Sequence, residues 1–179
     1  MTLVMLVGGE RIVRQMTEDE LFKSIDYQNA FFEEVELVLT RFKRFKEIQF
    51  SNTVDSAAYL DLLLVHVRAL FCDGQKGGEY TASKFFSRMG RTDLAQKIDT
   101  YFDQPLNDWM TYEDGQPLLR RTAIKMVVDK RIVHFDERSL DWKATTDYLA
   151  KYLVLRELEG MLLEMVKAIQ DWQRGLLKG

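Results

Sequence analysis

The most regular hydrophobic pattern in the sequence lies near its C-terminus. Apolar residues recur there at alternating steps of three and four positions, and charged or polar residues fill most of the positions between them. This spacing puts the apolar side chains on one stripe of an α-helix, as in a heptad seam. One helix cannot bury such a stripe alone, so it packs either within a bundle or against another subunit. The stripe consists of Leu155, Leu158, Leu162, Met165, Ile169, Trp172 and Leu176.

Helical periodicity also predicts further helices upstream. The longest begins at Thr17, where Glu20 completes a capping box, and carries apolar residues at three- and four-residue steps to about Phe50. Polar or glycine-rich breaks such as DGQKGGEY separate the segments. The expected fold is all-α, an up-and-down bundle of about five to six helices. The other helices are expected over residues 54–72, 82–89, 92–106 and 117–134.

The first residues, TLVMLVGGERIVRQM, carry the only pattern typical of strands. Two β-favourable runs flank Gly8-Gly9, a pair that takes the positive φ angles of a tight turn. This pattern predicts an N-terminal β-hairpin, and a frayed helical start is the alternative. The expected organisation is therefore a hairpin arm over residues 1–16 and one helical-bundle domain over residues 17–179.

Composition narrows the functional classes. The chain has 179 residues, a net charge of −3, 46% hydrophobic and 30% charged residues, which is far from the disordered regime and gives no overall attraction to polyanions. A single cysteine, Cys72, excludes an internal disulfide framework and fits a reducing compartment. With no apolar run of membrane-spanning length, the expected location is cytoplasmic, with no membrane span. No metal site and no cofactor are expected, because the usual ligand and phosphate-loop motifs are missing.

The stretch VVDKRIVHFDERSLDW holds His134, one of two histidines in the chain. On a helix, Lys130 lies four residues before it and Arg138 four after. Two cations beside an imidazole favour its neutral form and lower its pKa, so the ring can serve as a general base. The alternative is a structural histidine that bonds a backbone carbonyl at a helix junction.

His66 lies in the apolar run LLLVHVRALF and is expected to be a core histidine with its hydrogen bonds satisfied. Arg68 follows two residues later, and its charge needs a partner if it is buried. Acidic residues from the helix near His134 are the expected source of that partner.

A cluster of cations shares the helix that leads into His134. A phosphate backbone laid along this helix would meet the cations first and then the imidazole. The residues expected to bind nucleic acid are Arg120, Arg121 and Lys125, followed by Lys130 and Arg131 closer to the histidine.

The segments VDKRIVHFDER and LLLVHVRALF together resemble HEPN-like proteins, over roughly residues 53–176 in helix order and spacing. The resemblance implies a helical bundle of the kind found in bacterial defence and toxin–antitoxin systems, which often dimerises with its motif helices facing each other. In ribonucleases of the family an arginine stands five residues before the histidine. Here His134 matches, whereas Asp129 occupies the arginine position. The sequence therefore looks more like the branches that keep the bundle without the nuclease motif.

The expected function is a non-catalytic HEPN-like interaction module, a homodimer that binds a protein or nucleic-acid partner such as RNA. The alternative is a metal-independent endoribonuclease of a defence or toxin–antitoxin system. In that alternative His134 is the catalytic acid or base, and Lys130, Arg131 or Arg138 hold the phosphate. A bundle that binds an apolar small ligand near His66 is a third interpretation, and whether the chain is an enzyme stays open.

Overall fold

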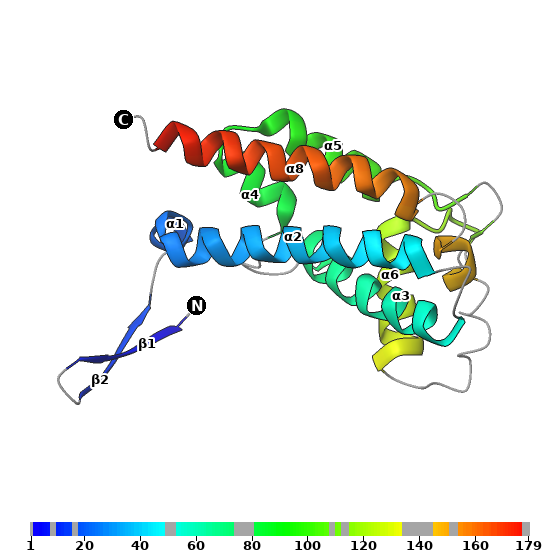
Figure 1. Cartoon of the computed structure of the whole chain (residues 1–179), viewed down its shortest axis with the longest axis horizontal. Helices are drawn as coiled ribbons and strands as arrows, with labels where there is room; N and C mark the ends of the chain where they lie inside the picture. The colour runs from blue at the N-terminus through cyan, green and yellow to red at the C-terminus, as the bar shows by residue number, and fades with distance from the viewer. Residues whose placement is uncertain are drawn as a thin grey trace. The chain divides into compact units, whose positions relative to one another are not determined.

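The chain is described here from a computed structural model that covers residues 2–7, 10–15, 18–48, 53–73, 81–107, 110–111, 115–133, 145–150 and 154–176. Helices make up most of these residues (Figure 1), which confirms the all-α class. None of the described helices combines the length and the apolar character needed to cross a lipid bilayer.

The chain divides into two compact units, Met1–Glu33 and Glu34–Gly179. Their boundary falls inside α2 (Ile25–Ile48), whereas the sequence suggested a boundary after residue 16. In the first unit, β1 (Thr2–Val7) pairs with β2 (Glu10–Gln15) in antiparallel register, with Val4 opposite Val13.

The helix predicted from Thr17 to Phe50 is wrong as a single element, because it is interrupted at Ser24. The structure has a short α1 (Glu18–Lys23) followed by α2. At the break, Nε2 of Gln28 donates to the carbonyl oxygen of Phe22 at 2.8 Å. This bond satisfies one of the carbonyl groups left without a partner where α1 ends.

In the second unit, residues 34–48 of α2 run beside α8 (Val154–Leu176) in the opposite direction (Figure 1). Lys46 Nζ donates to Glu159 Oε2 at 2.7 Å between them. The apolar stripe of α8 is buried from Leu158 to Ile169 as its periodicity predicts, whereas Trp172 is half-buried and the side chains of Leu155 and Leu176 lie outside the described residues. The stripe of α2 is likewise buried in the second unit. The buried residues are Val35, Val38, Leu39, Phe42 and Phe45 in α2, and Leu158, Leu162, Met165 and Ile169 in α8.

Two helices change from α-helical to wider π-helical turns. The first, α3 (Thr53–Val67), continues as η1 (Arg68–Cys72), and the second, α6 (Arg120–Val127), continues as η2 (Val128–Val133). η1 packs against α6, and η2 packs against α3. Such turns are rare and are frequent at functional sites, so the region where they meet is the natural place to look for chemistry.

The remaining helices complete the core. α4 (Ala82–Arg88) begins after Thr81, whose Oγ1 accepts from the backbone N–H of Lys84 at 3.4 Å, as expected of an N-cap. α5 (Thr92–Phe102) buries Leu94, Ile98 and Phe102, as predicted, and Phe102 stacks on Phe71 of η1 with ring centroids 4.7 Å apart. Residues 145–150 are also helical.

Candidate functional site

Arg121 is the centre of a charged network at the start of α6. Only 8% of its side chain is exposed. Its Nε donates to Asp103 Oδ1 at 2.9 Å, its Nη2 to Asp99 Oδ1 at 3.1 Å, and its Nη1 to the carbonyl oxygen of Phe71 at 2.7 Å. A guanidinium can be buried at low cost only when it is paired and hydrogen-bonded in this way.

The acceptors of Arg121 come from several elements. Asp99 lies in α5 and Asp103 at its C-terminal end, while Phe71 belongs to η1. Asp99 also accepts a hydrogen bond from the hydroxyl of Ser83 in α4. One buried side chain therefore holds α6 to α5 and to the π-helical turn of η1.

Arg120 is buried to the same degree and faces a different set of partners. Its Nη1 donates to the carbonyl oxygen of Tyr101 at 3.3 Å and to Glu157 Oε2 in α8 at 3.4 Å. Its guanidinium carbon lies 4.5 Å from the centre of the Tyr101 ring, in cation–π geometry. The Nε atom is buried with no hydrogen-bond partner in the described part of the chain. Arg120 thus links α6 to α5 and α8, and its contacts are weaker than those of Arg121.

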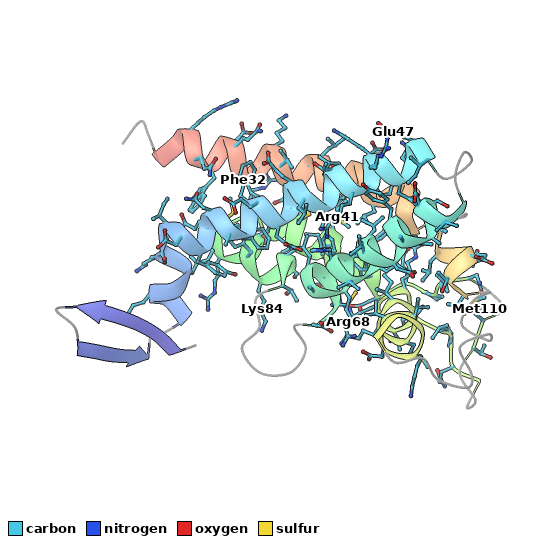
Figure 2. The ribbon with its side chains drawn as sticks, turned by 60° about the horizontal axis from the view of Figure 1, so that its bottom comes forward. Phe32, Arg41, Glu47, Arg68, Lys84 and Met110 are labelled. Carbon is cyan, nitrogen blue, oxygen red and sulfur yellow. The ribbon has the colours of Figure 1, made fainter. Side chains whose placement is uncertain are left out.

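Arg68 begins η1 and joins it to η2. Its Nε donates to Asp73 Oδ1 at 2.9 Å, and its Nη1 donates to Asp129. Figure 2 shows Arg68 at the end of α3, next to the yellow helix of α6 and η2. Burial opposes the charge of Arg68, but the hydrogen bonds to Asp73 and Asp129 outweigh it, so the pKa of the guanidinium is raised. The prediction that an acid near His134 pairs with Arg68 is confirmed.

The residues predicted to bind nucleic acid differ in their exposure to solvent. The expectation that Arg120 and Arg121 offer charge to a phosphate backbone does not fit this geometry, because both side chains are buried and bonded within the chain. Further along the same helix Lys125 is half-buried and Lys130 is exposed. The described residues bring these lysines onto one continuous helical segment, α6 followed by η2.

The other predicted site residues fall outside what the structure describes. His134 and Arg138 lie beyond the end of η2, outside the described residues, and for Arg131 the backbone is described but the side chain is not. Their roles therefore stay predictions.

The two remaining candidate groups are the imidazole of His66, which is hydrogen-bonded, and the thiol of Cys72, which is buried. His66 is half-buried rather than in the core, and its Nδ1 is hydrogen-bonded to a carboxylate oxygen of Glu34 in α2. Cys72 is fully buried, and desolvation raises the pKa of its thiol to about 12. The thiol is protonated at neutral pH, so it is a packing group rather than a nucleophile.

Sequence reasoning missed the carboxylates that complete the network. Asp99 and Asp103 lie on another helix, 22 and 18 residues before Arg121. Their four-residue spacing puts them on one face of α5, which was the available signal. No cluster of three or more His, Cys, Asp or Glu side chains suited to a metal ion occurs among the described residues.

No family model, curated protein or solved structure matches this chain. Arg68, Arg120 and Arg121 are bonded to carboxylates of the same chain, and the Cys72 thiol is protonated. This arrangement can fasten helices together, and it provides neither an activated nucleophile nor an uncommitted pair of arginines for a phosphate.

Proposed function

We propose that this chain is a non-catalytic helical interaction module that self-associates as a homodimer and binds a protein partner. The observation that carries the proposal is that the arginines at the junction of η1 and α6 are hydrogen-bonded to acceptors of the same chain. Arg121 alone donates to two carboxylates and a backbone carbonyl. A bound carboxylate cancels the charge that a phosphate would need, so Arg121 serves the fold and does not bind a phosphate.

The position that resembles the arginine of the HEPN-like nuclease motif supports the same proposal. Asp129 stands there, and its carboxylate is bonded to Arg68. The acidic net charge of −3 also disfavours a polyanion as the main partner. The proposal includes the HEPN-like up-and-down bundle arrangement, the β1–β2 hairpin as an N-terminal arm, and a cytoplasmic location.

The test is an RNA-cleavage assay with the purified full chain and EDTA, using wild type and His134→Ala. His66→Gln is the matched control, because it removes the other histidine and keeps a side chain that can bond Glu34. We expect no cleavage by any of the three proteins. RNA cleavage by the wild type that is lost in His134→Ala and kept in His66→Gln would establish the nuclease instead.

A further inference from the structure

One stripe of α2 faces α3 in the second unit. Near one end of the stripe Glu34 is hydrogen-bonded to His66 of α3, and at the other end Arg44 interacts with Tyr59 of α3. Side chains three and four residues apart share one line along a helix, so the residues between these two contacts face the same way. The stripe consists, at steps of three, four and three, of Glu34, Leu37, Arg41 and Arg44.

The surface between the two contacts is apolar and partly exposed. Leu62 of α3 lies three residues after Tyr59 and four before His66, so it shares their face of that helix. Leu62 is 46% exposed, and Leu37 of α2 is 37% exposed. Two leucines from neighbouring helices are therefore left open to solvent between two polar contacts. We call Leu37, Arg41 and Leu62 together the α2–α3 strip.

Arg41, about midway along α2 (Figure 2), is a cation without a partner among the residues that the structure describes. Its side chain is half-buried, and its Nη1 is buried with no hydrogen-bond partner. Arginine keeps its charge in proteins, and a buried N–H without an acceptor costs free energy. The fold thus leaves the guanidinium of Arg41 open to an acceptor from elsewhere. By contrast, interactions are made by each of the other arginines with described side chains: Arg44, Arg68, Arg88, Arg91, Arg120, Arg121 and Arg174.

The charges at the ends of the strip are already paired. Glu34 bonds His66, and Nη1 of Arg44 donates to Oε2 of the exposed Glu47 at 2.9 Å. The strip therefore offers one unpaired charge, that of Arg41, between two leucines. A polyanion would need several unpaired cations and would be repelled by the two glutamates. A single carboxylate flanked by apolar groups matches the strip instead.

We infer that the α2–α3 strip docks an amphipathic helix of a partner protein, with an aspartate or glutamate of that helix bonded to Arg41 and its apolar side chains covering Leu37 and Leu62. A carboxylate is the acceptor that fits a guanidinium in a paired hydrogen bond. A helix presents one acidic and several apolar side chains on one face at the spacing that the strip has. Arginine is also enriched among the residues that carry most of the energy at interfaces. This inference rests on the partner binding in the proposed function and names its surface and the chemistry of the partner.

Urea unfolding tests whether the guanidinium of Arg41 is unpaired in the fold. Arg41→Met keeps an unbranched apolar stem and removes the buried N–H. Lys43→Met is the matched control, because it removes the same charge from an exposed position about 200° round the same helix. We expect the unfolding midpoint of Arg41→Met to equal or exceed that of Lys43→Met, because the lost group has no acceptor to leave behind. A clearly lower midpoint would show that the fold already pairs this guanidinium and would overturn the inference.

A phage-displayed library of helical peptides, selected against the immobilised full chain, tests the chemistry of the partner. We expect the enriched peptides to carry Asp or Glu one helical turn from Leu, Ile or Phe. In calorimetric titration, a synthetic peptide of this kind should bind Arg41→Met at least about tenfold more weakly than it binds the wild type and Lys43→Met. Arg41→Glu should bind the same peptide again once the peptide's acidic residue is replaced by Lys, because exchanging the two charges keeps a direct contact.

The other outcomes separate the strip from the proposed function. Enriched peptides that bind the wild type and Arg41→Met equally well, or a charge exchange that restores no binding, would overturn the strip and leave the partner-binding module standing. A library that yields no peptide for the wild type would overturn both the strip and the binding of a protein partner. The RNA-cleavage assay still decides independently whether the module is catalytic.

Discussion

At the residue scale, the main feature is that buried arginine side chains hydrogen-bond to acceptors of the same chain. The guanidinium of Arg121 offers several donors in a rigid plane, and the surrounding carboxylates and carbonyl of the chain match that geometry. Arg120, its neighbour, has poorer contacts and a buried Nε with no partner in the described part of the chain. Adjacent residues of the same type therefore contribute unequally, and Arg121 is the one expected to hold the junction of η1, α5 and α6.

We predict that Arg121→Ala lowers the free energy of unfolding by about 2–3 kcal/mol. Removing the guanidinium leaves two carboxylates and a buried carbonyl without their donor, although the half-exposed carboxylates are partly rescued by water. Arg91→Ala is the control, since the Arg91–Asp93 pair is exposed and its loss should change stability little. Urea unfolding monitored by circular dichroism measures both. An Arg121→Ala protein as stable as Arg91→Ala would contradict the structural role of the network.

At the element scale, the α8 helix shows how a heptad pattern is satisfied within one chain. Leu158, Leu162, Met165 and Ile169 are buried by the same chain, so this part of the seam needs no second subunit. On α3, by contrast, Leu60, Leu63, Leu64 and Val67 supply the core contacts on one face, while Leu62 on the opposite face is 46% exposed.

Adjacent leucines of α8 provide a sharp test of its packing. Leu162 is fully buried and Leu163 is 48% exposed. We predict that Leu162→Ala costs about 3 kcal/mol of stability, from lost burial and the cavity left behind. Leu163→Ala should change stability by less than about 0.5 kcal/mol. Helix propensity changes equally in both variants, so thermal or urea unfolding isolates the packing term. Equal losses would mean that α8 is not docked by this face.

At the scale of the whole molecule, the periodicity of the sequence predicted which face of each helix is buried, because that depends on the spacing within a single helix. The buried stripes of α2, α5 and α8 follow from spacing alone, because side chains three and four residues apart share a face. The break at Ser24 was missed because the apolar spacing continues across it, from Leu21 to Ile25. The π-helical turns were missed because a single widened turn leaves the apolar pattern nearly unchanged.

The candidate site was less predictable than the fold. In the sequence, a run of cations such as Arg120, Arg121 and Lys125 has the same pattern whether the side chains face solvent or the core. Burial of the first two is decided by the packing of α5 against α6, which brings Asp99 and Asp103 within reach. Only the pairing of Arg68 with an acid near His134 was predicted, because a buried charge requires a partner.

The arginines at the start of α6, Arg120 and Arg121, are bonded inside the fold and are not offered to a ligand. Arginine-specific modification of the native full chain with phenylglyoxal, followed by peptide mass mapping, tests it most directly. We expect Arg91 and Arg44, which are exposed, to react readily, and Arg120 and Arg121 to react only after unfolding. Modification of Arg120 and Arg121 in the folded protein as fast as that of Arg91 would show that their guanidinium groups are accessible to a ligand.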